Sequence, residues 1–421
     1  MARYATIETR LMPQNNPINA PLMWVFLFFS LAVSVATRQL IWLMVVLGLW
    51  SLLTNNREFK QVVGMREAAL LFACLALPGI VSLISAANFD RAASAVFRFS
   101  TYILASWVLL SATLDRDDPK KIMSWIGLLL VIWAADGFLQ LLTGFSTMGD
   151  PLVELGEEGT IVTGSLQLGY GATLAILSPF FLEGLRRAGG MGIGFLSLPV
   201  YAAIVMSGHQ SSAVLAVVGF IGWAILTLRA EDETGTKRQV TGFALAAIVG
   251  MMLGGYLSVV TGQVSSMTDA APRYQSFLYQ SSLWSAGWQA FTEHWFNGVG
   301  VRGFGSYLID TQLMASESVS ASWHPHLTVL EIAAETGLVG IAGYAVLLYL
   351  LIGYLRDERR PVAIAALVAL LAIFPLSSAV SLYSFFGGNL IFLTFTLLVA
   401  FNRDCPKSKQ KTSASDSAST L

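Results

Sequence analysis

The chain has 421 residues, of which 55% are hydrophobic and only 12% are charged. Soluble domains carry about 25% charged residues, and the mean hydropathy here is +0.64, so the composition excludes an ordinary soluble protein and predicts a polytopic membrane protein. The formal net charge of −1 says little, because in a membrane protein the placement of charge matters more than its sum. We expect no nucleic-acid partner.

Runs of about 20 apolar residues are long enough to cross a bilayer as helices. In chain order they predict about twelve transmembrane helices, at residues 21–36, 39–54, 67–86, 96–114, 122–143, 164–182, 191–207, 211–228, 240–260, 336–355, 361–382 and 386–402. The predicted fold class is an all-α polytopic membrane protein, with helices 1–9 in residues 21–260 and helices 10–12 in residues 336–402. One long polar segment, residues 261–335, separates the two groups.

The positive charges predict the orientation of these helices. If the N-terminus lies inside, 20 of the 25 Lys and Arg residues fall on the inner side. The five on the outer side are Arg38, Arg91, Arg98, Arg273 and Arg302. Because Lys and Arg are enriched in cytoplasmic connectors, we expect both termini in the cytoplasm and residues 261–335 outside.

The two ends of the chain are polar. Residues 1–20 lead into an apolar run without an obvious cleavage site, so we expect a cytoplasmic tail rather than a cleaved signal peptide. Residues 403–421 are basic and then rich in Ser, Thr and Ala, which is typical of a disordered tail. Cys405 lies in this tail and Cys74 in an apolar segment, so we expect no disulfide.

The outer segment 261–335 is too long for a structureless loop in a compact protein, so we expect it to fold as a cap over an active site. Aromatic residues recur in it at helical spacing: Phe277, Trp284, Trp288, Phe291 and Trp295. This stripe predicts a helix that Gly298 ends. Trp and Phe on one face favour a helix that lies at headgroup level or packs on the bundle.

Outer arginines are rare in this chain, and Arg273 and Arg302 both lie in the cap segment. Each has two interpretations. The side chain either anchors the chain to lipid headgroups or holds a phosphate of a lipid carrier, whose oxygens match the guanidinium fork. We favour phosphate binding for Arg273. Arg91 and Arg98 are equally open to both interpretations.

The motif Ser-Trp-His-Pro-His at residues 322–326 is the sharpest local signal. Pro325 suits the first position of a helix, which would place His326 in the first turn. There the helix dipole would attract an anion and keep the imidazole neutral, as a general base requires. The alternative is that His324 and His326 only cap a helix or bind water. Two histidines without a third ligand predict no metal site.

Other polar residues fall within or beside the predicted helices. Glu331 and Glu335 share one helix face and either orient the histidines or cap the helix in solvent. Asp136 interrupts an apolar helix, and we interpret it as a structural hydrogen-bond node. His209 and Gln210 lie in a tight outer turn. Each of them has either a structural role or a role in the site, and the sequence does not favour one over the other.

Two stretches resemble the O-antigen ligase and polymerase superfamily of bacterial inner-membrane enzymes. Residues 272–307 resemble its pattern of Arg, Trp and a Pro-x-x-Gly-x-Gly turn, and residues 324–340 resemble its His-x-His-Asn…Glu-x-Gly-Leu-x-Gly pattern. Residues 159–180 are similar to the stretch that opens one of the family's spans. The resemblance covers roughly the last two thirds of the chain.

The resemblance implies an O-antigen ligase of the GT-C-like type. Such an enzyme transfers a glycan from undecaprenyl diphosphate to a hydroxyl of lipid A-core at the periplasmic face of the inner membrane, in lipopolysaccharide biosynthesis. The expected reaction inverts the anomeric centre and uses no cofactor. By the same resemblance Arg273 binds the diphosphate with Arg302, and His326 is the catalytic base with His324 beside it.

The chain departs from the family pattern at two places. Leu327 stands where an Asn usually follows the second histidine, and His209 and Gln210 stand where the family often has an arginine. We expect His209 or Gln210 to replace that arginine in part as a substrate-binding residue. An O-antigen or exopolysaccharide polymerase is the first alternative function. A lipid-linked sugar flippase or transporter is the second.

Overall fold

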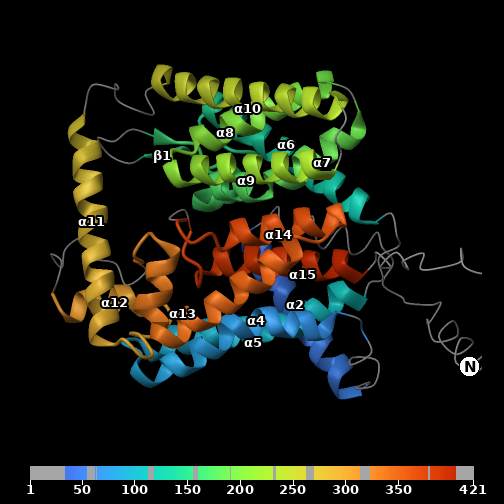
Figure 1. The fold of residues 1–421 in the computed structure, drawn as a ribbon. Helices are drawn as coiled ribbons and strands as arrows, with labels where there is room; N and C mark the ends of the chain where they lie inside the picture. The colour runs from blue at the N-terminus through green and yellow to red at the C-terminus, as the bar shows by residue number, and fades with distance from the viewer. Residues whose placement is uncertain are drawn as a thin grey trace, which may run out of the picture.

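The computed structural model describes residues 34–54, 62, 64–111, 118–154, 160–189, 191–230, 234–261, 270–312, 323–377 and 380–403. Apart from a two-residue hairpin, these residues form helices and their connections, which confirms the predicted all-α class (Figure 1). The helices are α2 (Ser34–Thr54), α4 (Met65–Ser82), η1 (Leu83–Ser85), α5 (Phe89–Ser111), α6 (Asp118–Thr143), η3 (Gly164–Gly169), α7 (Tyr170–Ala188), η4 (Met191–Ser197), α8 (Leu198–Met206), α9 (Gln210–Ala230), α10 (Thr234–Val260), α11 (Ala270–Glu293), α12 (Phe304–Asp310), α13 (Thr328–Leu355), α14 (Arg360–Ala372) and α15 (Phe385–Arg403). The hairpin pairs β1 (Val153–Glu154) with β2 (Thr160–Ile161).

The helices make this a multi-pass membrane protein. In the described part of the chain, seven helices are long and apolar enough to cross a bilayer: α4 with η1, α5, α6, α9, α10, α13 and α15. Shorter apolar helices lie at 40–54, 194–206 and 360–372. Every predicted span from 39–54 onward falls on a helix, whereas the predicted span 21–36 lies almost wholly outside the described residues.

One predicted boundary is wrong. Helix α14 ends at Ala372 rather than at residue 382, and the described residues at 373–377 and 380–384 belong to a connector to α15. Helix α13 runs from Thr328 to Leu355 with a break at Gly337, where φ is 62°, so its first part lies in the predicted cap segment and its second part matches the predicted span 336–355. The predicted cap segment therefore ends inside this helix.

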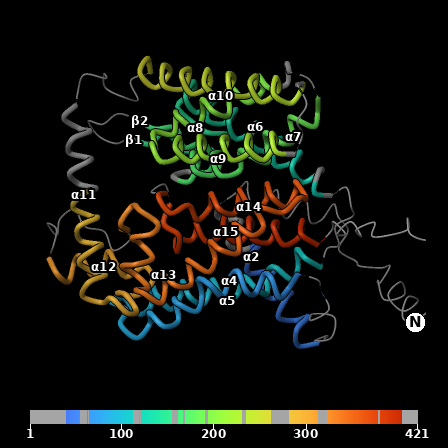
Figure 2. Tube along the Cα trace, in the orientation of Figure 1, coloured from blue at the N-terminus to red at the C-terminus, as the bar shows by residue number. Residues whose placement is uncertain are grey.

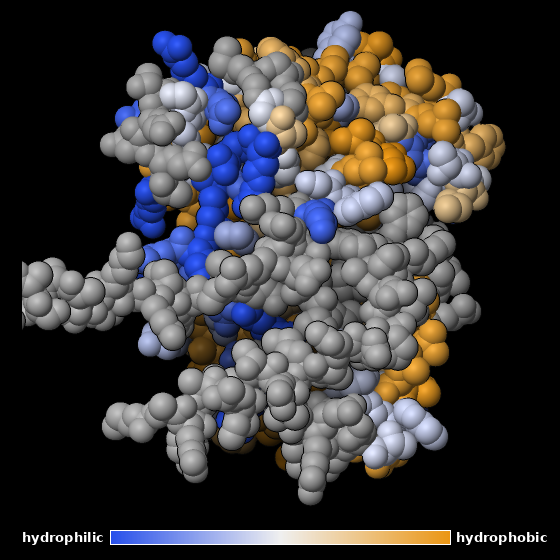
Figure 3. Space-filling model, turned by 90° about the vertical axis from the view of Figure 1, so that its right-hand side faces the viewer, coloured by the Kyte–Doolittle hydropathy of each residue, from blue (hydrophilic) through white to orange (hydrophobic). Residues whose placement is uncertain are grey.

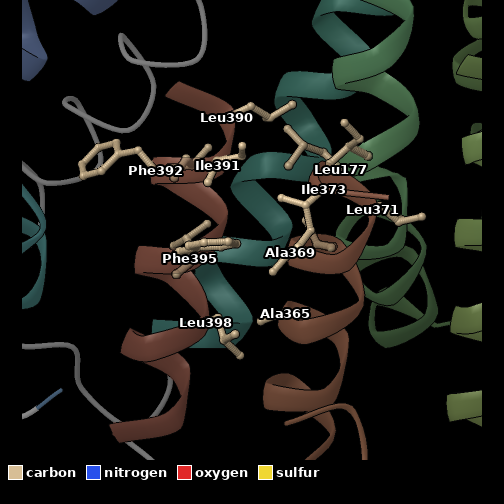
Figure 4. Packing of buried hydrophobic residues seen from close by; sticks show 14 of the residues in the cluster. Leu177, Ala365, Ala369, Leu371, Ile373, Leu390, Ile391, Phe392, Phe395 and Leu398 are labelled. Atoms are coloured by element: carbon tan, nitrogen blue, oxygen red, sulfur yellow. The ribbon is translucent and has the colours of Figure 1, made fainter. Parts of the chain in front are cut away.

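Helices α14 and α15 form the centre of the bundle. Helix α15 is buried along nearly its whole length, and small residues of α14 let the two helices approach closely. Figure 4 shows Phe395 and Leu398 of α15 beside Ala365 and Ala369 of α14, with Leu177 of α7 nearby. Helices α6 to α10 lie on one side of this centre and α4, α5 and α13 on the other (Figures 1 and 2).

Helix α10 packs on α8 through glycines. A Cβ at Gly250 would lie 2.5 Å from the carbonyl oxygen of Leu198, and one at Gly254 would overlap the carbonyl oxygen of Ala202. Two glycines four residues apart thus let two backbones touch, as small residues often do between membrane helices. Gly255 faces open space instead.

The bundle has two different ends. Helices α11 and α12 and strand β1 lie at one end, which we call the capped end, and α11 runs across it (Figure 1). At the opposite end Arg186, Arg187 and Arg360 converge on the fully buried carboxylate of Glu183, at 2.7–3.1 Å. Figure 3 views this opposite end, where hydrophilic side chains gather on part of the face.

The helix contact of α10 predicts the effect of two neighbouring substitutions. Gly254→Ala should lower stability by about 1–3 kcal/mol, the usual cost of forcing an extra methyl group into a packed contact, because the new methyl group meets the backbone of α8. The matched change Gly255→Ala adds the same group in open space and should have almost no effect. Thermal unfolding of the purified variants in detergent measures both. Equal losses would contradict this packing.

The two ends also predict which residues a reagent reaches from outside the cell. Asp310 is exposed at the capped end, and Glu358 is exposed at the opposite end. With Cys74 and Cys405 replaced by Ser, a membrane-impermeant maleimide should label Asp310→Cys in intact spheroplasts. It should label Glu358→Cys only after the membrane is permeabilised. The reverse pattern would invert the predicted orientation.

Candidate functional site

Two of the predicted site residues lie together just before α13. The ring centroids of His324 and His326 are 4.1 Å apart. Helix α13 begins at Thr328 with Leu327 as its N-cap, so the prediction that Pro325 opens the helix and that His326 lies in its first turn is wrong. His326 instead has a φ of 52°, in the left-handed region that residues other than glycine rarely adopt.

The start of α13 is occupied by protein groups. The N–H of Thr328 donates to the carbonyl oxygen of Ser377 at 3.0 Å, and the N–H of Val329 donates to that of Pro375 at 3.1 Å. The first N–H groups of a helix bind anions only when they are free. The expectation that this helix start stabilises an anion is therefore wrong, because the α14–α15 connector takes its donors.

A second loop, residues 298–303, is locked to the break in α13. The N–H groups of Val299 and Gly300 donate to the carbonyl oxygens of Ala334 and Glu335 at 2.9 and 3.0 Å. A Cβ at Gly298 would overlap the backbone of Glu335, and one at Gly337 would overlap that of Phe296. Only glycine permits so close an approach of two backbones.

Arg302 lies in this loop with a φ of 56°. Its N–H donates to the Oε2 atom of Glu335 at 2.7 Å. The neighbouring residues Val301 and Gly303 are buried, whereas Arg302 is partly exposed. The loop thus buries its neighbours and leaves the arginine side chain at the surface of the site.

Glu331 and Glu335 are not solvated caps, which rejects one of the two interpretations of the pair. Each is 1% exposed. Glu331 accepts hydrogen bonds from the Oγ of Ser381 at 2.5 Å and the N–H of Leu382 at 3.2 Å, so it fixes the connector that covers the start of α13. His326 also acts on it electrostatically.

Burial and neighbouring charges keep two of the imidazoles neutral. Burial, together with the positive charge of Arg302, lowers the pKa of His324 to about 4. Burial, together with His326, lowers the pKa of His209. The Nε2 atom of His324 is buried and has no hydrogen-bond partner among the described residues. Three of the four histidines thus gather with Arg302, although they come from two distant parts of the chain.

The remaining predicted residues are placed differently. Gln210 is the exposed first residue of α9. Arg273 lies near the start of α11, and its side chain lies outside the described residues. Arg98 donates to the carbonyl oxygen of Tyr383 at 2.6 Å and lies over the ring of Phe385, so it holds the connector before α15. The headgroup and phosphate interpretations of Arg91 stay open.

Asp136 is the structural node that the sequence predicts. Its carboxylate accepts the N–H of Thr147 at 2.6 Å and both the N–H and the hydroxyl of Ser165 at 2.7 Å. Gln140, one turn later, accepts the N–H groups of Thr163 and Gly164 at 2.9 and 2.8 Å. Together they fix the polar loop between α6 and α7.

Helix α11 covers the histidine segment. Leu283, Ala286 and Ala290 form its buried face against Val299 and Phe304. A Cβ at Gly287 would lie 3.0 Å from Leu330 and 3.4 Å from Pro325, so the helix rests directly on the residues around His326. On the other side of α11 Trp288 is 60% exposed, and Trp295, in the turn after the helix, is 57% exposed. Both are in accord with a helix at headgroup level.

The connector between α14 and α15 contributes to the site although the sequence patterns did not predict it. Four of its residues, Pro375, Ser377, Ser381 and Leu382, bind the start of α13 or Glu331. The signal was present, because four serines interrupt an apolar run there, and polar residues at membrane depth need partners. Within the described part of the chain, no group of three or more His, Cys, Asp or Glu is arranged to hold a metal ion.

A comparison with protein families gives a match over part of the chain. Residues 194–345 match the family model described as O-antigen ligase. The matched region runs from η4 to the middle of α13, and it includes His209, Arg302, His324 and His326. No curated protein and no solved structure matches the chain significantly.

The lowered pKa of His324 predicts a pH-dependent stability. Between about pH 6.5 and pH 4 the unfolded chain binds a proton at this histidine and the folded chain does not, so the free energy of unfolding falls as the pH falls through this range. Thermal unfolding at pH 7 and pH 5 should show a larger loss for the wild type than for His324→Gln, which carries no titratable group there. Parallel losses in the two proteins would contradict the assignment.

Proposed function

We propose that the protein is an O-antigen ligase, because residues 194–345 match the family model described as O-antigen ligase. The family supports a transferase of lipid-linked glycans in general. The proposed donor is a glycan on undecaprenyl diphosphate, and the proposed acceptor is a hydroxyl of lipid A-core at the periplasmic face of the inner membrane. One observation carries the proposal: His209, His324 and His326 gather with Arg302 at the capped end of a membrane bundle.

The geometry favours His326 over His324 as the general base. With a pKa of about 4, His324 has little tendency to take a proton near neutral pH, and an efficient base has a pKa near the working pH. His326 lies beside the buried carboxylate of Glu331, which acts on it electrostatically. A carboxylate near an imidazole stabilises the charge that forms when the imidazole accepts a proton.

In the proposed reaction His326 takes the proton of the acceptor hydroxyl. The oxygen then attacks the anomeric carbon from the face opposite the leaving group, so a new C–O bond forms as the bond to the diphosphate breaks. The electron pair of the broken bond leaves on a phosphate oxygen. Arg302 and Arg273 stabilise this charge through charge-assisted hydrogen bonds, in place of the helix start whose donors are occupied.

The other parts of the site have supporting roles in this proposal. His209 is neutral and lies close enough to His326 to interact with it, so it can donate a hydrogen bond to a phosphate or sugar oxygen. Helix α11 carries Arg273 near its beginning and rests on the His326 segment. It therefore links the two proposed ends of the donor site. A polymerase would use the same chemistry with a second lipid-linked glycan as acceptor.

Three variants test the proposal. His326→Ala should lower the rate of glycan transfer by about 10²–10⁴-fold, the usual contribution of a general base, and Arg273→Ala should abolish transfer at ordinary donor concentrations. His294→Ala is the matched control. This histidine makes an edge-to-face contact with Tyr307 and has no assigned role in the reaction, so the variant should transfer glycan at the wild-type rate.

The assay combines purified protein, an undecaprenyl-diphosphate-linked glycan and one acceptor at a time, and reads product length on a gel. Transfer to lipid A-core supports a ligase. Elongation of the lipid-linked glycan supports a polymerase instead. Normal transfer by His326→Ala would reject the assignment of the base.

A further inference from the structure

We propose that Glu335 is a positioning residue that holds Arg302 in the orientation in which it binds the diphosphate of the donor. The inference rests on the proposed function, and it assigns a role to a carboxylate that touches no substrate. The geometry that carries it is the hydrogen bond from the N–H of Arg302 to the Oε2 atom of Glu335, at 2.7 Å.

The Glu335 carboxylate is directed at the backbone of the arginine loop. It accepts the N–H of Arg302 and also that of Phe304, the first residue of α12. Gly303, the N-cap of α12, offers no side-chain cap, so the carboxylate takes the place of that cap. One side chain of α13 therefore fixes both the arginine and the helix that follows it.

Arg302 needs this restraint because its backbone is strained. Its φ of 56° lies in the left-handed region, which an arginine rarely adopts and which persists only where the surroundings impose it. The N–H of Val301 donates to the Oγ of Ser82 at 3.3 Å, and the N–H of Ala87 donates to the carbonyl oxygen of Val299 at 2.8 Å. The loop is thus held before Arg302 by α4 and at Arg302 by Glu335.

The restraint leaves the arginine side chain available. Among the described residues no hydrogen-bond or ion-pair partner of the Arg302 guanidinium is found, although Glu335 is close enough to interact with it electrostatically. The carboxylate is instead occupied by backbone donors. The guanidinium also acts on His324, so it lies on the side of the loop that faces the histidine segment. A phosphate bound there would pair with the Arg302 guanidinium, because the Glu335 carboxylate is hydrogen-bonded to backbone N–H groups instead.

The inference predicts a specific change in kinetics. Glu335→Leu removes the acceptor, so it should raise the KM for the undecaprenyl-diphosphate-linked donor about 10-fold or more, as Arg302→Ala does, with a smaller change in kcat. Glu335→Gln keeps one acceptor oxygen and should raise the KM only a few-fold. In an Arg302→Ala background neither change at Glu335 should raise the KM further, because the side chain that it positions is gone.

Asp136→Asn is the matched control. Asp136 is also a buried carboxylate that accepts backbone N–H groups in a loop beside a helix, but it is not bonded to Arg302. This variant should lower the thermal stability and leave the donor KM unchanged. The mild variant Glu335→Gln keeps the test decisive if Glu335→Leu does not fold.

The outcomes separate the inference from the proposed function. If the wild type transfers glycan and the effects of Glu335→Gln and Arg302→Ala on the KM multiply in the double variant, Glu335 acts independently of Arg302 and the inference is rejected. A donor KM that Glu335→Gln leaves at the wild-type value while the stability falls rejects it too. If the wild type transfers no glycan to any acceptor, the proposed function itself fails.

Discussion

The site depends on the contact between the loop at residues 298–303 and the break in α13 at Gly337. Backbone meets backbone at Gly298 and Gly337, and a methyl group at either position would overlap the other segment. The loop donates two N–H groups to α13 carbonyl oxygens, and Glu335 accepts the N–H of Arg302 in return. Because interiors are close-packed, this contact fixes Arg302 and the start of α13 as one unit.

A second constraint acts on the histidine side of the same helix. The α14–α15 connector takes the first N–H groups of α13, and Glu331 binds that connector in turn. Helix α11 then rests on Pro325 and Leu330. The segment that carries His326 therefore lies between the connector and α11, and His326 itself has a left-handed backbone, with a φ of 52°. Such local strain is often found where a side chain must be placed for chemistry.

The two ends of the bundle differ in how their charged groups are paired. At the end opposite α11, buried Glu183 of α7 forms ion pairs with three arginines, one of which, Arg360, belongs to α14. At the capped end, Glu331 and Glu335 accept hydrogen bonds from backbone and hydroxyl donors. The opposite end is thus held together by ion pairs between helices, whereas these two carboxyl groups of the capped end bind neutral donors.

The sequence by itself determined the fold class, the positions of most helices and the segments that carry the site, because apolar runs and the scarcity of outer arginines are local properties of the chain. It also identified Asp136 as a node, since a carboxylate in an apolar helix must find donors. Only the tertiary structure decided how the residues meet. His209 interacts with His326 across more than 100 residues, Glu335 binds Arg302, and the connector after α14 occupies the start of α13. The spacing of residues shows which of them share a helix face. Contacts between distant segments depend on tertiary packing, which the sequence of one segment alone does not determine.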